Sequence, residues 1–506
     1  FIIIPSNSRK KYVILLEDVI RLCLPKLFAQ FGFNSFEAYV IKLTRDAELD
    51  IDNDVDTDLI TGIEKGLKNR KKGKALRLVY DKSIQKNLLK YLVGLLRIGK
   101  KDYRVPGGRI HNFKDFMQFP AEVFDLTVSR KPPFVLPQLC QPVRILDRLR
   151  KQDIMLHFPY HSFDSIIDLL RESAIDPYVE SIQITAYRLA KNSKIVHALL
   201  NAVRNGKKVM VVLELKARFD EEANLRWKRV LEEEGVKVVL SYPEQKIHAK
   251  ICLITKRQNK KLAYFGFVST GNLNEDTAKV YGDHCLLTAD VRILKEVALV
   301  FRYFQHREST DLLARCEHLI VSPINTRTFF LKKIRKEMAN HKVGKPAGCM
   351  IKLNSLSDPI LIEEIYKAAE CGLKMQLIIR GICCAITEHK KWPHPIEAIS
   401  IVDQYLEHSR AFYFVNNGKE EVYISSADWM SRNLDHRIEV TCPVYAPALI
   451  EEIKQILHLQ WIENVKARRF DNSQSNQYVL KQSDEPVIRS QEKIYEMLFT
   501  QSFRNE

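Results

Sequence analysis

The sequence lacks the features of a membrane-spanning or secreted protein. No uninterrupted apolar run reaches about 18 residues, which excludes a helix that spans a bilayer, and no segment is typical of a signal peptide. The 10 cysteines include no C-x-x-C pair and no framework spacing, so a disulfide scaffold is excluded. We therefore expect a cytoplasmic protein with reduced thiols, with peripheral membrane association left open. The chain opens on Phe1 without a methionine, which predicts that residues precede it.

The balance of charge is strongly basic. The 506 residues carry a formal net charge of +17, and 46% of them are hydrophobic. This length allows about three domains with large cores. The charge favours a polyanionic partner such as nucleic acid, nucleotide, anionic membrane or polyphosphate, and does not choose among them.

The first part of the chain predicts an α+β head domain. Residues 1–142 mix helical stretches such as "LLEDVIRLCLPKLFAQF" with strand-like stretches such as "ALRLVYD". Within them, Lys65–Lys74 holds a dense run of cations, which is typical of a solvated loop or of a polyanion-binding arm. The proline-rich segment Ser129–Pro142 resists helix and central strand, and predicts the first domain boundary.

The rest of the chain predicts an α/β fold. From about residue 145, apolar strands alternate with amphipathic helices, and Gly206 and Gly235 fall where helices should end. The pattern then recurs: "IVHALLNAVRNGKKVMVVLELKAR" has a partner in "LIEEIYKAAECGLKMQLIIRGICC". This indicates a duplication of about 160 residues, with predicted domains at 143–318 and 319–506.

A polar constellation repeats with the duplication. The stretch "KIHAK" places His248 two residues before Lys250, and "LEHSR" places His408 two residues before Arg410. Residues i and i+2 of a strand share a face, so each imidazole should lie beside a cation. A Ser/Thr-Gly/Ala-Asn/Asp turn follows in each half, and a carboxylate stands 13 residues after Thr270 and again 13 residues after Ser426.

These residue types suit phosphoryl chemistry. Cations and turn residues, here Asn272 and Ser426, can hold a phosphoryl group whose charge needs donors in fixed places. A neutral imidazole can attack phosphorus, and a carboxylate on its other nitrogen fixes the tautomer. The spacing makes Asp283 and Glu439 the candidates for that orienting role. A lone strand histidine is usually structural, but two at matched repeat positions favour function.

The constellation resembles the phospholipase D superfamily, whose repeated H-x-K motif transfers phosphoryl groups through a phosphohistidine. Two departures separate this chain from that pattern: Thr255 stands five residues after the first lysine, where an aspartate is usual, and Arg410 replaces the second lysine. Longer stretches, among them "ITAYRLAKNS", "STGNLNEDTAKVYGD", "LIIRGICC" and "YISSADWMSRNLDHRIE", resemble bacterial polyphosphate kinase. The fold that this resemblance implies has two phospholipase-D-like α/β domains after the α+β head domain.

The resemblance also implies roles for single residues. His248 would be phosphorylated by ATP, and His408 would contact the nucleotide and act as general acid or base. Tyr281 and Arg380 would line the ATP site. The family places Arg188 and Arg218 at the magnesium and phosphate position. Because a guanidinium has no acceptor atom, we expect these two arginines to hold phosphate oxygens that themselves bind Mg²⁺.

The function that follows is reversible phosphoryl transfer from ATP to inorganic polyphosphate, with ADP as the other product and Mg²⁺ as cofactor. Expected partners are ATP, ADP and polyphosphate, and a second copy of the chain in a dimer or tetramer; we expect no nucleic acid. Two alternatives stay open: a phospholipase-D-like phosphodiesterase or nuclease, and a non-catalytic polyanion-binding protein.

Overall fold

The structure is a computed structural model of the chain. It describes residues 1–7, 10–45, 75–99, 103–124, 126, 130–140, 142, 144–215, 221–241, 245–258, 261–306, 310–481 and 483–503. The chain divides into two compact units, Phe1–Lys131 and Pro132–Glu506. The cationic run Lys65–Lys74 and Arg218 lie outside the described residues.

The first unit has the mixed α and β content that the sequence predicts. Its described elements are β1 (Ile2–Ile4), β2 (Tyr12–Ile14), α1 (Leu16–Leu27), β3 (Ile41–Arg45), β4 (Ala75–Asp81), α3 (Lys86–Leu95) and β5 (Tyr103–Gly107). β1 and β2 form an antiparallel hairpin, and β4 lies between β3 and β5 in a small sheet. Ala75, Leu78 and Ile98 form its small buried core.

The two compact units divide between Lys131 and Pro132, inside the proline-rich segment Ser129–Pro142. The first residues after this point are held by hydrogen bonds to the rest of the second unit. The backbone N–H of Phe134 donates to the carbonyl of Tyr160 at 3.0 Å, and the hydroxyl of Tyr495 donates to the carbonyl of Pro132 at 3.1 Å.

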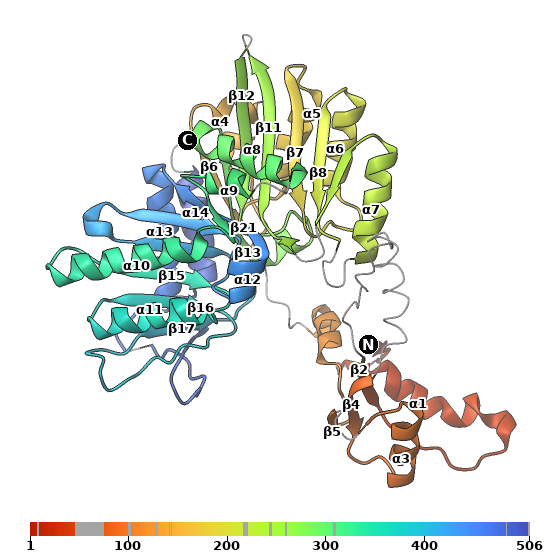
Figure 1. The fold of residues 1–506 in the computed structure, drawn as a ribbon. Helices are drawn as coiled ribbons and strands as arrows, with labels where there is room; N and C mark the ends of the chain where they lie inside the picture. Colours follow the sequence, from red (N-terminus) through yellow and green to blue (C-terminus); the bar gives the residue numbers. More distant parts are fainter. Residues whose placement is uncertain are drawn as a thin grey trace. The chain divides into compact units, whose positions relative to one another are not determined.

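The first half of the second unit is a sheet with helices on its faces (Figure 1). Its strands are β6 (Ile154–Phe158), β7 (Val179–Ala186), β8 (Lys208–Leu213), β9 (Lys237–Leu240), β10 (Lys246–Ile247), β11 (Lys250–Gln258), β12 (Lys261–Ser269) and β13 (Tyr281–Thr288). Its helices are α4 (Ile145–Leu149), α5 (Asp164–Ile175), α6 (Lys194–Arg204), α7 (Glu221–Glu233), α8 (Val291–Gln305) and α9 (Asp311–Ala314). β7, β8 and β9 pair in parallel, as the alternation of strands and helices predicts. Gly206 and Gly235 end α6 and α7 with φ of 77° and 88°, a conformation that glycine adopts freely.

The second half repeats this arrangement. Its strands are β14 (Ile320–Ser322), β15 (Cys349–Leu353), β16 (Met375–Ile379), β17 (Glu397–Ile401), β18 (Leu406–Glu407), β19 (Arg410–Phe414), β20 (Glu421–Ser425), β21 (Arg437–Val444) and β22 (Ala467–Arg469). Its helices are α10 (Thr326–Lys342), α11 (Pro359–Glu370), α12 (Ser431–His436), α13 (Pro447–Trp461) and α14 (Ser490–Phe503). β15, β16 and β17 pair in parallel, and β19 and β20 form an antiparallel hairpin.

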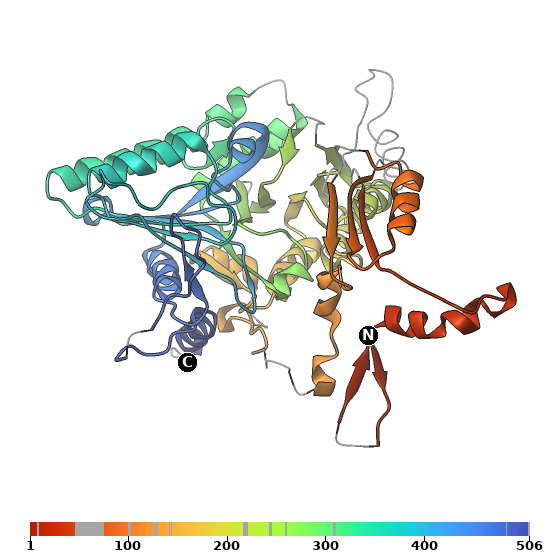
Figure 2. The ribbon, with the colours of Figure 1, turned by 90° about the horizontal axis from the view of Figure 1, so that it is seen from below.

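Alternate side chains of the second sheet bury against different helices. Phe412, Phe414 and their neighbours pack with residues of α10 and α11, whereas Ala411, Ile424 and their neighbours pack with residues of α13. This is the period-2 alternation of a sheet that is covered on both sides. Figure 2 shows α10 on one side of the strands, and α13 and α14 on the other.

Two short strands cross between the halves and make them one unit. β10 of the first half pairs in parallel with β21 of the second, with Lys246 opposite Arg437. β18 of the second half pairs in parallel with β13 of the first, with Leu406 opposite Tyr281. These crossings bring the two motifs, His248–Lys250 and His408–Arg410, to adjacent edges of the two sheets. In the described part of the chain, no helix combines the length and the hydropathy needed to cross a bilayer.

Candidate active site

Each candidate histidine lies just after a crossing strand. His248 follows β10, and the backbone N–H groups of His248 and Ala249 both donate to the carbonyl of Ile438 at 2.9 Å. His408 follows β18 in the same way, with the N–H groups of His408 and Ser409 donating to the carbonyl of Gly282. The structure therefore corrects the prediction that each histidine and its cation share one continuous strand, because both motifs turn between two strands.

The orienting carboxylates are exchanged between the halves. Nδ1 of His248 lies 2.8 Å from Oε2 of Glu439. Nδ1 of His408 lies 2.9 Å from both carboxylate oxygens of Asp283. Both carboxylates contact imidazoles as their spacing suggested, and each imidazole is held by the half that does not contain it. In the first pair the Nε2 atom of His248 is the nitrogen left for other chemistry. In the second pair the Nε2 atom of His408 lies 3.4 Å from Nη1 of Arg410.

A hydroxyl group fixes each carboxylate in turn. Thr270 Oγ1 donates to Asp283 Oδ1 at 2.6 Å, and Ser426 Oγ donates to Glu439 Oε2 at 2.5 Å. The single proton of the Ser426 hydroxyl is thus committed to Glu439, a different contact from the phosphate that the sequence suggested. A Cβ atom at Gly271 would lie 2.1 Å from Oδ2 of Asp283, so only glycine lets this carboxylate approach.

The two pairs differ in their electrostatics. Burial lowers the pKa of His248 well below its ordinary value, and the nearby cations Lys250 and Arg437 lower it further. Burial raises the pKa of its partner Glu439 to about 7, against the opposing effect of the same cations. The imidazole of His248 is therefore held neutral at physiological pH.

In the second pair, the carboxylate of Asp283 stays ionised. Although burial opposes it, the contact with His408 and the hydroxyl of Thr270 hold the pKa of Asp283 below its usual range. Burial lowers the pKa of His408, but Asp283 raises it in the opposite direction. His408 therefore has an ionised partner and retains more proton affinity than an imidazole under burial alone would have.

The cations of the two motifs, Lys250 and Arg410, are both buried. Nζ of Lys250 donates to the carbonyl of His248 and lies 5.3 Å from the centre of the Tyr187 ring. Burial lowers the pKa of Lys250 well below its ordinary value. Arg410 donates to Asp428 at 2.8 Å and to the carbonyl of His408 at 3.0 Å. Each cation is thus held against the backbone of its own histidine.

Tyr281 and Arg380 also lie near His408. The rings of Tyr281 and His408 have centres 5.2 Å apart. Arg380 donates through Nε and Nη2 to Oδ1 of Asn354, at 3.0 and 2.9 Å, and the amide of Asn354 donates to the carbonyl of His408 at 3.0 Å. Tyr281 thus lies beside the second imidazole, and Arg380 is linked through Asn354 to the backbone of His408.

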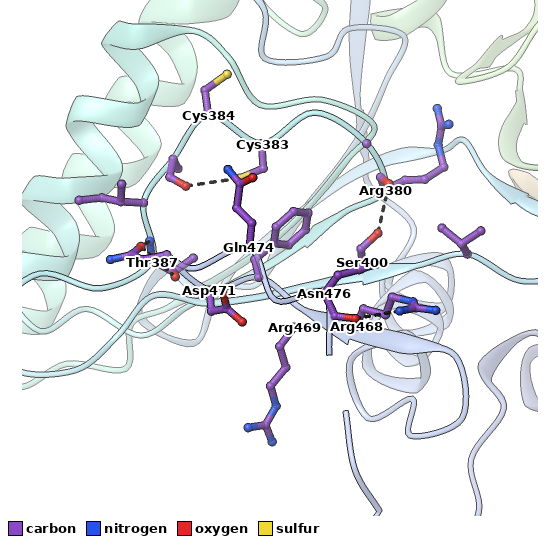
Figure 3. Close-up of a pocket in the computed structure, with 16 residues that line it drawn as sticks. Arg380, Cys383, Cys384, Thr387, Ser400, Arg468, Arg469, Asp471, Gln474 and Asn476 are labelled. Carbon is purple, nitrogen blue, oxygen red and sulfur yellow. Dashed lines mark hydrogen bonds between the residues drawn. The ribbon is translucent and has the colours of Figure 1, made fainter. Parts of the chain in front are cut away.

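A cavity of about 800 Å³ opens next to Arg380, beyond the carboxyl end of β16, where α/β sheets often bind ligands. Figure 3 shows its lining. Arg468, which lines it, donates to the carbonyl of Asn476 and to the hydroxyl of Tyr478. The side chain of Arg380 points away from the other labelled lining residues, and the residues that line the cavity include neither His248 nor His408.

The structure says less about the other three residues predicted to contact phosphate, which are Arg188, Asn272 and Arg218. Arg188 follows β7, and its guanidinium lies 5.8 Å from the centre of the Tyr187 ring. Among the described residues, Asn272 has a buried Oδ1 atom without a hydrogen-bond partner. Arg218 lies outside the described residues.

The described residues do not fit a directly bound Mg²⁺. They contain no group of three or more His, Cys, Asp or Glu side chains that could hold a metal ion. Asp283 and Glu439 are engaged by imidazoles and hydroxyls, and Asp428 by Arg410 and the backbone N–H of Asn354. Arginines offer donors and no ligand atom.

Sequence reasoning missed three residues of this site. Arg437 lies 3.8 Å from Glu439 and contributes to the lowered pKa of His248. Asp428 neutralises Arg410, and Tyr187 lies edge-on to His248 with ring centres 5.0 Å apart. The duplication could have revealed Arg437, because it precedes Glu439 by the same two residues by which Tyr281 precedes Asp283.

The arrangement suits transfer of a phosphoryl group. It offers one neutral imidazole, a second imidazole with an ionised carboxylate, and buried cations around both. A phosphoryl group in flight carries negative charge on its equatorial oxygens, which fixed cations stabilise strongly where water is excluded.

Comparison with known proteins supports the same chemistry. Family models match three stretches: the polyphosphate kinase middle domain at residues 1–119, C-terminal domain 1 at 144–310 and C-terminal domain 2 at 319–491. The polyphosphate kinase of Vibrio cholerae is 42% identical over 502 residues, covering 98% of this chain and 71% of that protein. The Escherichia coli K12 polyphosphate kinase is 40% identical over 508 residues, covering 98% and 73%.

A solved structure matches over nearly the whole chain. The polyphosphate kinase of Porphyromonas gingivalis aligns with a TM-score of 0.85 at 35% identity, covering 99% of this chain and 73% of that one. Sequence, family models and fold thus agree along the length of the molecule. The chain belongs to the polyphosphate kinase family.

Proposed function

We propose that the chain catalyses reversible transfer of the γ-phosphoryl group of ATP to the end of inorganic polyphosphate, through a phosphohistidine at His248. The observation that carries this proposal is the exchanged pairing of histidines and carboxylates. Glu439 accepts the Nδ1–H of His248 at 2.8 Å, which leaves the lone pair on Nε2. Burial and neighbouring cations keep that imidazole neutral and therefore nucleophilic.

In the first step, Nε2 of His248 attacks the γ-phosphorus of ATP. A P–N bond forms as the bond between the γ-phosphorus and the β,γ-bridging oxygen breaks, and the electron pair of that bond leaves with ADP. His408 is proposed to donate a proton to the departing oxygen, since its Nδ1 is held by ionised Asp283. Tyr281 and Arg380 are proposed to contact the nucleotide beside it.

In the second step, a terminal oxygen of polyphosphate attacks the phosphorus of phosphohistidine. The P–N bond breaks, its electron pair returns to Nε2 of His248, and the polymer is one phosphate longer. A phosphoramidate is a high-energy donor, so ADP can accept the group as well and the reaction runs in reverse. Lys250, Arg410 and Arg188 are proposed to stabilise the charge in both steps; the same role is proposed for Arg218.

Mg²⁺ is proposed to enter with the substrate. The described carboxylates of the site are already engaged, so the ion would be bound by the phosphate oxygens of ATP, and the arginines would hold those oxygens. Assembly into a dimer or tetramer and a cytoplasmic location, with or without peripheral membrane association, stay predictions. Sedimentation velocity of the purified chain measures the first of them.

The test uses γ-labelled ATP with Mg²⁺ and the full-length protein. We expect acid-labile, base-stable label on the unaltered protein and none on His248→Ala, together with polyphosphate in the unaltered reaction. Label that survives in His248→Ala and disappears in His408→Ala would reverse the roles of the two histidines.

The alternative functions give different outcomes. A phosphodiesterase would hydrolyse a phosphodiester without ATP, and a binding protein would retain polyphosphate without forming label or polymer. Either result would overturn the proposal.

A further inference from the structure

A buried carboxylate lies directly before His408. Glu407 is 4% exposed and accepts three hydrogen bonds. Nζ of Lys352 and Nε2 of Gln460 both donate to its Oε2 atom, at 2.6 and 2.7 Å. Nε2 of Gln491 donates to its Oε1 atom at 2.7 Å. Because both of its oxygens accept hydrogen bonds, the carboxylate can hold this segment rigidly.

Gln491, in the first turn of α14, binds the same segment a second time. Its Oε1 atom accepts the backbone N–H of Tyr405 at 2.9 Å, and its Nε2 atom donates to the carbonyl of Tyr405, also at 2.9 Å. One amide side chain thus completes the backbone hydrogen bonds of a residue three positions before His408. Lys352 acts on the other side, since its Nζ also donates to Oγ of Ser409 at 2.8 Å.

The first half has a different arrangement at the matched position. Ile247, which directly precedes His248, is apolar and 3% exposed. Its backbone N–H donates to Oε2 of Glu214 at 3.0 Å. Burying an ion pair such as Lys352–Glu407 costs desolvation energy that an apolar pair would avoid, so the second half carries a feature that the shared fold does not require.

We propose that Gln491 is a positioning residue for His408, acting with Glu407 and Lys352 through β18, the strand that directly precedes the imidazole. This inference rests on the proposed role of His408 as the proton donor in phosphoryl transfer. β18 has two residues and a single strand partner, β13. Gln491, Glu407 and Lys352, which we call the clamp, supply the restraint that so short a strand lacks. A displacement of about 1 Å of a reacting group can cost about 100-fold in rate.

The competing explanation is that Gln491 merely attaches α14 to the fold. The same helix offers a matched control, because Nε2 of Gln501 donates to Oε1 of Gln455 on α13 at 2.9 Å. Gln501 thus ties α14 to α13, and this hydrogen bond does not involve the segment that precedes His408. α13 and α14 lie side by side, as Figure 2 shows.

The experiment compares Gln491→Met with Gln501→Met in the full chain. Methionine keeps the length of the side chain and removes its hydrogen bonds. We expect Gln491→Met to lower kcat for ATP synthesis from polyphosphate and ADP about 10- to 100-fold with KM for ADP little changed, and Gln501→Met to stay within about twofold. Gln460→Met, which removes one donor from Glu407 and leaves Tyr405 alone, should give an intermediate loss.

A second readout separates positioning from folding. In protein labelled with ¹⁵N-histidine, the ring signals and titration of His408 should move in Gln491→Met and stay unchanged in Gln501→Met, while the signals of His248 stay unchanged in both. Equal losses of activity and of melting temperature in the two variants, with His408 signals unmoved, would overturn the inference. If the unaltered chain forms no phosphohistidine, the proposed function fails instead, and the ring signals still report whether the clamp positions His408.

Discussion

Nδ1 of His248 lies 2.8 Å from Oε2 of Glu439, a residue 191 positions further along the chain. The pairing across the two halves means that neither half contains a complete histidine–carboxylate pair. The matched contact of His408 with Asp283 runs in the opposite direction between the halves. A single duplicated half therefore cannot assemble this chemistry in the same way, and the predictions below follow from these two contacts and their surroundings.

Glu439→Gln should slow the formation of phosphohistidine by about 10²- to 10⁴-fold, the range seen when the carboxylate that orients a catalytic imidazole is neutralised. The amide keeps the shape of the side chain and removes the charge that fixes the tautomer of His248. Rapid-quench labelling with γ-labelled ATP measures the rate. Labelling at the unaltered rate would show that Glu439 does not orient the nucleophile.

The labelling rate should fall as the pH drops below about 7. Burial raises the pKa of Glu439 to about 7, so acid protonates the carboxylate that accepts the Nδ1–H of His248. We expect a loss approaching tenfold per pH unit below that pKa. Single-turnover labelling between pH 5.5 and 9 measures the profile. Glu439→Gln should lack this acid limb, and a flat profile in the unaltered protein would contradict the prediction.

The same substitution should raise stability at high pH. Because the pKa of Glu439 is above its ordinary value of 4.5 in the folded state, ionisation of the buried carboxyl group disfavours the fold as the pH rises from about 4.5 through about 7. Glutamine removes that cost, which is about 3 kcal/mol at most. Thermal melting should show Glu439→Gln above the unaltered protein at pH 8, with the difference disappearing towards pH 4.5.

Gly271→Ala should damage the site, whereas the matched change Ala427→Gly should not. A Cβ atom at Gly271 would lie 2.1 Å from Asp283 Oδ2, so Asp283 must move away from His408. The second half carries Ala427 at the equivalent position, and its replacement by glycine should cost about 1 kcal/mol of stability. We expect about a 100-fold loss of polymer synthesis in Gly271→Ala. Equal activities of the two variants would refute the close approach.

Chain elongation should weaken steeply with added salt. The net charge of +17 suits a polymer that carries about one negative charge per phosphate, and binding such a polymer releases counterions as nucleic acids do. Elongation from a preformed primer at fixed Mg²⁺, measured between 50 and 400 mM KCl, should fall by a power law, and single-turnover labelling from ATP should fall less. An elongation rate that does not depend on the KCl concentration would argue against an extended cationic path for the product.

Much of the fold and the composition of the site could be predicted from local patterns in the sequence. Apolar alternation and glycine turns are local properties, so the βαβ units and the turns at Gly206 and Gly235 could be predicted and are confirmed. The duplication and its two 13-residue spacings singled out Asp283 and Glu439 before any contact was known, because a repeated polar pattern is hard to explain by packing alone.

The contacts between these residues arise only in the folded chain. Which histidine pairs with which carboxylate depends on the crossing of β10 and β18 between the sheets, and no local pattern encodes a pairing between residues more than 100 positions apart. The crossing of β10 also brought Arg437 to the site, opposite Lys246. The hydroxyl of Ser426 reaches Glu439 because β20 and β21 pair within the second sheet. The hydrogen bond from Gln491 to Glu407 joins residues 84 positions apart. A buried carboxylate without hydrogen-bond donors would be costly, and here the fold supplies a donor from a distant part of the chain.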